Sequence, residues 1–391
     1  MVNYVLATEE QKELAMNARK ILEDHLLPRL EELQQADGGL GAFSQEVKQL
    51  LVDAGYYGMN IPEEYGGLGL DLVTQTVIVE EMSKVEAGFA FAAFNAGNLF
   101  PLILKTGMPE EEKRAWADRI LAGAMGSFAL TEPSAGSDAA ALRTVAVKDG
   151  NEWVLNGTKC FISGAPNADH FIIFAWTDKN ERPSKGITAF FVEKERGVKI
   201  GKKEHKMGLK LSETAEVILE DVRVPEDHIV GSLGRGFGEA LGLLNAEGRI
   251  FDAVCSLGLG QAALDFAVDY AKTRRQFGKR IIDHQGLGFL IADMEIKMNA
   301  ARALLYQTVE AMSQGKDTHH LTSSVKTFVT DTVMQVTTDA VQVLGGYGYS
   351  AEYPVEKYMR DAKIFQIFGG TNQIQRKIIT QDLAGRDPEK K

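Results

Sequence analysis

The segment EWVLNGTKCFISG, residues 152–164, decides the fold class of this chain, because apolar and polar residues alternate along it with the period of a β-strand. Three later segments are likewise predicted to be short strands, and they are HFIIFAWT (170–177), ITAFFVE (187–193) and AEVILEDVRVP (215–225). Turn residues such as Asn156-Gly157 are expected to separate the strands. The pattern predicts a β-rich domain from about residue 126 to residue 232.

Helical periodicity flanks this β-rich region on both sides. From residue 9 to about residue 125, apolar residues recur at spacings of three and four, and the same spacing returns after residue 233. The helices predicted in the second region are 236–274, 285–314, 318–344 and 351–382. We therefore predict an α+β protein of three domains, namely an N-terminal helical domain (1–125), a middle β-barrel or β-sandwich domain (126–232) and a C-terminal helical bundle (233–391).

The composition argues against several classes of function. The net charge of −11 is unfavourable for nucleic-acid binding, which depends on clustered Lys and Arg. Cys160 and Cys255 are far apart, and no Cys or His spacing predicts a metal site or a disulfide framework. The longest apolar window, residues 89–104, is interrupted by Asn and Pro residues and is too short to span a bilayer. We therefore expect a cytoplasmic protein without membrane insertion, bound metal or a nucleic-acid partner.

Four short motifs carry information beyond periodicity. They are FALTEPSAGSD (128–138), YAKTRRQFGKRI (270–281), AVQVLGGYGY (340–349) and GGTNQIQR (369–376). In this order and spacing they resemble the acyl-CoA dehydrogenase family, and the resemblance extends over essentially the whole chain. The resemblance implies bound FAD, an acyl-CoA substrate, a homotetramer and an electron-transfer flavoprotein as the electron acceptor.

The motifs also indicate which residues would hold FAD. Thr131 and Ser137 place hydroxyl groups beside the turn at Gly136, which suits a flavin edge and a pyrophosphate. Phe161 and Ser163 lie on a predicted strand, where the ring suits a flavin face; relatives usually have Trp at the position of Phe161. By resemblance, the contacts to FAD come from Phe128, Leu130, Thr131, Gly136, Ser137, Phe161, Ser163, Thr371 and Gln373, and those to the FAD of a neighbouring subunit come from Arg274, Gln276, Phe277, Gln342, Gly345 and Gly346.

The residue that usually performs the chemistry is absent. In the family a glutamate removes the α-proton of the CoA thioester while the β-hydrogen leaves as hydride to the flavin. By resemblance this glutamate would stand at Gly369 or at Gly248, and both positions are glycine. Gly369 keeps a backbone N–H, so the sequence predicts a site that still binds a thioester but lacks the usual base.

Asp252 is the best candidate for a relocated base. It follows Arg249 by three residues on a predicted helix, in a segment that is otherwise apolar or small, where a lone buried charge is costly. The alternative is that Asp252 only pairs with Arg249. Glu86 is a further candidate, although its place near charged residues predicts a solvated side chain.

The substrate is expected to contact a wall rich in aromatic residues. Phe89, Phe91 and Phe94 are bulky and their segment has no charge, which favours a flat or cyclic apolar acyl group. We expect at least one of these rings to belong to the helix core instead. The residues predicted to bind the substrate are Phe91, Asn95, Ser137, Arg249, Asp252, Phe368 and Gly369.

Three functions remain open at the level of the sequence. The first is an FAD-dependent oxidoreductase with a relocated base, for example an alicyclic acyl-CoA dehydrogenase. The second is a non-redox lyase such as a sulfinoacyl-CoA desulfinase, which would need a cation to hold its leaving anion. The third is a catalytically silent homologue that binds FAD or CoA, in which the flavin motifs would be expected to decay.

Overall fold

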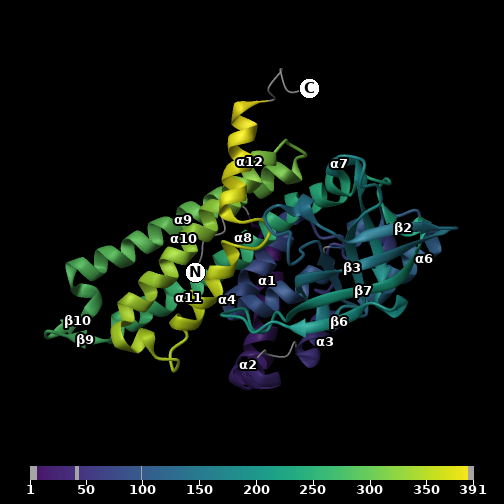
Figure 1. Cartoon of the computed structure of the whole chain (residues 1–391). Helices are drawn as coiled ribbons and strands as arrows, with labels where there is room; N and C mark the ends of the chain where they lie inside the picture. Colours follow the sequence, from purple (N-terminus) through teal and green to yellow (C-terminus); the bar gives the residue numbers. More distant parts are fainter. Residues whose placement is uncertain (1–6, 40–43, 98, 386–391) are drawn as a thin grey trace.

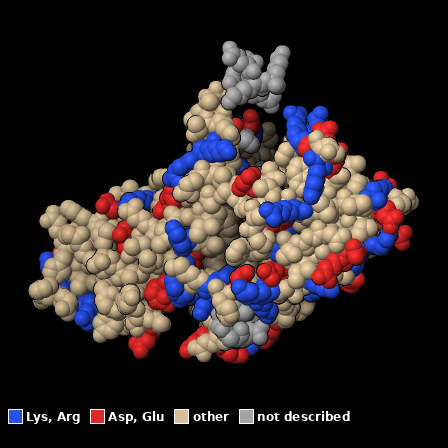
Figure 2. Space-filling model, in the orientation of Figure 1, with Lys and Arg blue, Asp and Glu red and all other residues tan. Residues whose placement is uncertain are grey.

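The structure of the chain is a computed structural model. It describes residues 7–39, 44–97 and 99–385, apart from the side chains of 36–39, 95–97, 243–246 and 319. Helices precede and follow a central β-sheet, and the sheet lies at one end of the molecule while the long C-terminal helices extend to the other (Figure 1). Charged residues of both signs are interspersed over the face shown in Figure 2.

The N-terminal part is helical, as the spacing of its apolar residues predicts. Its helices are α1 (Glu9–His25), α2 (Leu30–Gly39), α3 (Gln45–Asp53), α4 (Leu72–Gly97), α5 (Phe100–Ile103) and α6 (Glu110–Leu121). Helix α1 begins at a capping box, in which Thr8 Oγ1 accepts from Gln11 N at 3.2 Å and Gln11 Oε1 accepts from Thr8 N at 2.9 Å. Helix α4 is kinked at Glu86, whose backbone is not helical (φ −154°, ψ 104°).

The middle part is a single eight-stranded sheet with the order β6-β7-β3-β2-β4-β5-β8, and β1 pairs in parallel with β4. The strands are β1 (Gly126–Ala129), β2 (Val145–Asp149), β3 (Glu152–Ser163), β4 (His170–Trp176), β5 (Ile187–Glu193), β6 (Lys199–Lys203), β7 (Thr214–Pro225) and β8 (Ile229–Val230); the short helix α7 (Pro183–Gly186) precedes β5. The predicted turn at Asn156-Gly157 is wrong, because both residues lie inside β3, at a register shift between Leu155 and Gly157. A Cβ on Gly157 would overlap Thr144, so this close approach requires a glycine.

The C-terminal part is a helical bundle. Its helices are α8 (Gly236–Thr273), α9 (Gln285–Ser313), α10 (His319–Leu344), α11 (Val355–Phe365) and α12 (Asn372–Ala384), and the hairpin of β9 (Arg275–Gln276) and β10 (Lys279–Arg280) follows α8. The predicted helix 351–382 is therefore two helices, separated by a turn at 366–371. Gly369 (φ 61°) and Gly370 (φ 83°) occupy the left-handed region in this turn, which ends the helical path.

Helix α8 is the central element of the molecule. Among the described residues it is the one helix long and apolar enough to cross a membrane by length and composition, but 83% of that window is buried inside the protein, as in a core helix. A buried network joins it to α4 and α9: Arg302 binds Glu80 at 2.9 Å and Gln261 at 2.7 Å, and Tyr306 donates to Glu80 at 2.8 Å. These bonds fix α8 against α4, so the side chains that both helices direct toward the sheet are held in place.

Candidate functional site

A cavity of about 360 Å³ lies where the three parts of the chain meet. Its wall is formed by α4, β1 and the loop after it, β3, α8, the turn at 366–371 and the start of α12. The structure brings together here most of the residues that the sequence predicts, namely Phe91, Phe128, Leu130, Thr131, Gly136, Ser137, Phe161, Ser163, Arg249, Asp252, Phe368 and Gly369. Residues from distant parts of the sequence thus form one concave site.

Asp252 and Gly369 compete for the same space. A Cβ placed on Gly369 would overlap the Asp252 Oδ2 atom and lie 3.1 Å from Asp252 Cγ. A side chain at position 369 is therefore incompatible with the observed position of the Asp252 carboxylate. By contrast, a Cβ placed on Gly248 would meet nothing within 4 Å. The carboxylate of Asp252 thus occupies the place where a glutamate at position 369 would begin.

The environment of Asp252 changes its acidity. The residue is only 5% exposed, and its Oδ2 atom has no hydrogen-bond partner in the described part of the chain. Burial raises the pKa of Asp252 to about 7, although the charges of Lys326 and Arg249 act in the opposite direction. A carboxyl group with a pKa near 7 gains and loses its proton at neutral pH, as an acid or base catalyst must.

Arg249 does not neutralise Asp252 by direct contact. Its guanidinium donates to Thr322 Oγ1 at 3.5 Å, and no ion pair joins it to Asp252 among the described residues. Its Nε atom is buried without a hydrogen-bond partner in that part of the chain. The geometry therefore does not favour the alternative in which Asp252 serves only as the partner of Arg249.

The turn at Gly369 and Gly370 is held from two sides. Gln375 Nε2 donates to Gly369 O at 3.0 Å and to Gly370 O at 3.1 Å. Lys326 Nζ donates to Gly370 O at 2.9 Å and to Asn372 Oδ1 at 3.0 Å. The Gly369 N–H has no hydrogen-bond partner in the described structure, so it remains able to donate to a thioester oxygen.

Aromatic rings form part of the cavity wall. The ring of Phe91 stacks on that of Phe368, with centroids 4.9 Å apart and an interplanar angle of 19°. Phe94 also lines the cavity, whereas Phe89 is completely buried in the core. The expectation that at least one of the three rings belongs to the core is thus confirmed by Phe89.

The backbone of Phe161, which also lines the cavity, is strained. Its φ is 56°, which is unusual for a bulky residue, and 64% of the residue is exposed. Cys160 N donates to Thr131 O at 2.9 Å and so ties β3 to the loop after β1. A strained, exposed ring beside hydroxyl groups is the arrangement expected for a surface that covers a flavin.

The loop after β1 is anchored by a buried ion pair. Glu132 binds Lys159 Nζ at 2.8 Å and accepts from Thr144 N at 3.0 Å and Arg143 N at 2.6 Å. Lys159 is completely buried, and burial lowers its pKa to about 8 although Glu132 opposes this. These contacts fix Thr131 and the turn at Gly136 before any ligand binds.

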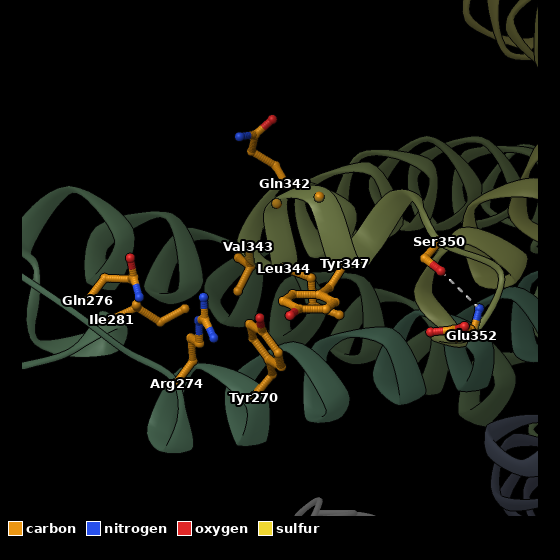
Figure 3. Close-up of a pocket in the computed structure, with 12 residues that line it drawn as sticks. Tyr270, Arg274, Gln276, Ile281, Gln342, Val343, Leu344, Tyr347, Ser350 and Glu352 are labelled. Carbon is orange, nitrogen blue, oxygen red and sulfur yellow. Dashed lines mark hydrogen bonds between the residues drawn. The ribbon is translucent and has the colours of Figure 1, made fainter.

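The second group of predicted cofactor residues lies in a separate cavity of about 560 Å³. Arg274, Gln276, Gln342, Gly345 and Gly346 line it, together with Tyr270 and Tyr347. Figure 3 shows Arg274 close to Tyr270 and Tyr347, with the Gln342 side chain directed away from them, and the Arg274 guanidinium lies 5.6 Å from the Tyr347 ring centroid. Phe277 is 95% exposed on the β9–β10 hairpin, at the tip of the molecule in Figure 1.

The remaining predicted residues lie outside both cavities or outside the described atoms. Thr371 caps α12, because its hydroxyl accepts from Ile374 N at 3.3 Å, and Gln373 is exposed to solvent. Neither residue lines the two cavities described above. The side chain of Asn95 is not among the described side chains.

The prediction that Glu86 is solvated is wrong. The residue is 2% exposed, its Oε1 atom pairs with Lys357 at 2.7 Å, and its Oε2 atom accepts from Phe89 N. Lys357 is 271 residues away in the chain, so local charge patterning cannot reveal this pair. Glu86 is therefore a structural acid at the kink of α4.

Glu247 is a cavity residue that the sequence reasoning missed. It lies on α8 next to Gly248, and burial raises its pKa while Lys105 acts in the opposite direction. Its position beside one of the two glycines that replace the usual base is the signal that could have identified it. Among the described residues, no group of three or more His, Cys, Asp or Glu is placed to hold a metal ion.

Comparisons with known proteins place this chain among acyl-CoA dehydrogenases. It matches the N-terminal domain of the family at residues 8–124, the middle domain at 127–222 and the C-terminal domain at 234–384. It is 40% identical over 378 residues to the probable acyl-CoA dehydrogenase FadE25 of Mycobacterium tuberculosis, covering 96% of this chain and 95% of that one.

Two further relatives are similar over nearly their full lengths. The Caffeyl-CoA reductase-Etf complex subunit CarC of Acetobacterium woodii is 38% identical, covering 95% of this chain and 98% of that one. The structure of butyryl-CoA dehydrogenase from Megasphaera elsdenii superposes with a TM-score of 0.91 at 38% identity, covering 97% of this chain and 99% of that one. The predicted fold class is thereby confirmed.

Proposed function

The chain belongs to the acyl-CoA dehydrogenase family, and from this premise we propose that it is an FAD-dependent oxidoreductase of acyl-CoA thioesters in which Asp252 replaces the usual glutamate. One observation carries the proposal: the Asp252 carboxylate occupies the space of the missing side chain at Gly369. Members of the family are FAD-dependent flavoproteins, and the cofactor here is FAD.

The residues of the first cavity fit this cofactor. Thr131, Ser137 and Ser163 offer hydroxyl groups for the polar edge of the flavin, and Phe161 offers a ring for its face. When bound there, FAD supplies the acceptor for the hydride that leaves the acyl group. The protein contributes a preformed loop, because the Glu132–Lys159 pair fixes the backbone that carries Thr131.

The proton is taken by Asp252 in its ionised form, while the Gly369 N–H donates to the thioester oxygen. A glutamate carboxyl carbon lies two bonds beyond its Cβ, whereas the Asp252 carboxylate overlaps the place of that Cβ. Asp252 therefore lies deeper in the wall than a glutamate at position 369 would. A base at this depth suits a substrate that loses its proton from a carbon other than Cα. A cyclic or bulky acyl group can place such a carbon next to the Asp252 carboxylate.

The aromatic wall supports the same substrate class. The stacked pair of Phe91 and Phe368 presents a flat apolar surface, and Phe94 adds a further ring to the cavity. A flat or cyclic acyl group packs against such a surface better than a straight chain does. The relative named as a caffeyl-CoA reductase points toward acyl groups of this shape.

The test compares the two carboxylates of the cavity by anaerobic reduction of bound FAD with a panel of cyclic and straight-chain acyl-CoA esters. With the ester that reduces the wild type, Asp252→Asn should slow reduction by about 100-fold or more at unchanged FAD content. Glu247→Gln is the matched control and should reduce FAD within a few-fold of the wild-type rate. If Asp252→Asn retains the wild-type rate, Asp252 is not the base, and loss in Glu247→Gln would transfer that role to Glu247.

A non-redox lyase remains the second candidate because of one observation. Arg249 lines the cavity and is 4% exposed, and its Nε atom has no hydrogen-bond partner in the described part of the chain. Arg249 is a cation that could hold a leaving anion. The apolar segment around Phe91 supplies no such cation. A lyase would break the C–S bond of a sulfinoacyl-CoA, form a C–H bond in its place and release sulfur dioxide, which water converts to sulfite, without any net change in the flavin spectrum.

The proposed assembly is a cytoplasmic homotetramer that passes electrons to an electron-transfer flavoprotein. The relative named as a subunit of a reductase–Etf complex supports this electron acceptor. The separation of the predicted FAD contacts into two cavities, and the exposed ring of Phe277, support sites shared between subunits. Intact flavin contacts do not favour a catalytically silent homologue.

A further inference from the structure

Lys326 and Asp252 both lie against the Gly369–Gly370 turn. Lys326 is on α10 and is completely buried. Its ammonium donates to Gly370 O and Asn372 Oδ1, at 2.9 Å and 3.0 Å. Asp252, on α8, places its Oδ2 atom against the neighbouring residue of the turn, Gly369. A buried cation and a buried acid thus lie against the same short turn.

The charge of Lys326 requires compensation, because a buried ammonium is costly unless it is paired. Its two hydrogen-bond acceptors are neutral oxygens, and the carboxylates that act on it are Asp252 and Asp331. Asp331 is already engaged by Arg376 at 2.7 Å and by Gln366 at 2.7 Å. Asp252 has no such partner for its Oδ2 atom among the described residues.

We infer that Lys326 is the counter-ion of Asp252 and acts as a positioning residue, which holds the Asp252 carboxylate in its ionised form across the Gly369–Gly370 turn. The catalytic meaning of this inference rests on the proposed function, whereas the pairing itself does not. A positive charge at this place stabilises the form of Asp252 that can accept a proton.

The other charged groups around Asp252 are less suited than Lys326 to act as its counter-ion. On α8, Arg249 also favours the carboxylate, but it is itself influenced by Asp382 of α12, and Glu247 is an acid. On α4, Glu86 is compensated by Lys357 of α11. On α10, Asp331 is held by Arg376. Lys326 lowers the pKa of Asp252 more than Arg249 does.

The direction of the effect follows from the charges. Burial raises the pKa of Asp252 to about 7 and lowers that of Lys326 to about 8, and each group opposes the shift of the other. Removing the charge of Lys326 leaves burial less opposed, so the pKa of Asp252 rises further. The fraction of Asp252 that is ionised then falls at neutral pH and recovers at higher pH.

An infrared pH titration of the FAD-loaded protein tests this without knowledge of the substrate. The carbonyl stretch of a protonated buried carboxyl group is followed, and the band that Asp252→Asn removes is assigned to Asp252. In Lys326→Gln, which keeps two N–H donors without the charge, the midpoint of this band should rise by about one pH unit. Lys326→Met serves as the second variant if the glutamine does not fold.

Two controls separate charge from structure. Lys326→Arg keeps the positive charge and should leave the midpoint near the wild-type value. Lys48, a half-buried lysine on α3, donates to Gly123 O at 3.0 Å and lines neither cavity. Lys48→Met should therefore not shift the midpoint. A lysine with a merely structural role would lower FAD content or melting temperature without shifting the midpoint.

The outcomes distinguish this inference from the proposed function. An unchanged midpoint in folded Lys326→Gln or Lys326→Met overturns the pairing, whatever Asp252→Asn does to flavin reduction. A shifted midpoint, combined with full flavin reduction by Asp252→Asn, supports the pair and rejects Asp252 as the base. A shifted midpoint with loss of reduction supports both.

Discussion

At the scale of single residues, position 369 disfavours any side chain for two independent reasons. Its φ of 61° lies in the region that favours glycine, and the space beyond its Cα is taken by the Asp252 carboxylate. The loss of the usual glutamate and the presence of Asp252 are therefore one structural change. Restoring only the glutamate would bring its Cβ atom into overlap with the Asp252 carboxylate.

This exclusion predicts how Gly369→Glu behaves. The single variant should lose about 2 kcal/mol of stability through backbone strain and crowding, and should not oxidise butyryl-CoA. The double variant Gly369→Glu with Asp252→Ala should regain part of that stability and reduce its FAD with butyryl-CoA. Melting temperature and anaerobic flavin bleaching measure both effects, with Asp252→Ala alone as the control. Equal activity of the single and double variants would show that the two residues do not compete.

The sequence reveals this site only in part, for a physical reason. The missing glutamate and the isolated carboxylate of Asp252 are visible locally, because each is unusual within its own segment. The role of Lys326 and the burial of Glu86 are not visible, since each depends on contacts between elements far apart in the chain. An electrostatic environment is a property of the packed structure.

At the scale of elements, the turn at 366–371 shows the limit of periodicity. Apolar spacing is helical on both sides of it, so the pattern predicts one helix where the structure has α11 and α12. The Gly369-Gly370 pair is the local sign of the break, and Lys326 and Gln375 hold the turn in place. Strand β3 shows the same limit, because Gly157 forms a bulge rather than a turn.

The strained backbone of β3 predicts opposite effects on stability and on FAD binding. Phe161→Gly should stabilise the FAD-free protein by about 1 kcal/mol, because it relieves a φ of 56°, yet should weaken FAD binding by removing the ring. Melting of the FAD-free protein and fluorescence titration with FAD measure the two quantities. Asp221→Gly relieves a φ of 53° on β7 but also removes the hydrogen bond from Asn156 Nδ2 at 3.0 Å, so it is a control for FAD binding only. Asp221 lines neither cavity, and FAD affinity should be unchanged. Weakened FAD binding in that control would contradict this account.

At the scale of the whole molecule, the order of helical, β and helical regions is predictable because periodicity is a local property of each region. The contacts between these regions cannot be predicted from periodicity. The first cavity forms from α4, β1, β3, α8 and the turn before α12, and it depends on long-range contacts such as Glu80 with Arg302. The resemblance of the motifs predicts that the residues lining the first cavity lie together. The packing of the helices against the sheet explains how they are brought together.

The second cavity carries the last prediction, which concerns assembly. If its residues complete the FAD site of a neighbouring subunit, Arg274→Ala should lower FAD content although the first cavity of each subunit is unchanged. Phe161→Gly damages the first cavity instead. Oligomers formed from a mixture of the two variants contain some sites built from one intact first cavity and one intact second cavity.

Such mixed oligomers should therefore bind more FAD than oligomers of either variant alone. Gel filtration with simultaneous flavin absorbance, after the variants are unfolded together and refolded, measures this recovery, and refolding of each variant alone is the control. A wild-type monomer that holds FAD, or a mixture that recovers nothing, would mean that each subunit builds its site by itself. In that case the exposed Phe277 ring and the second cavity would need a different explanation.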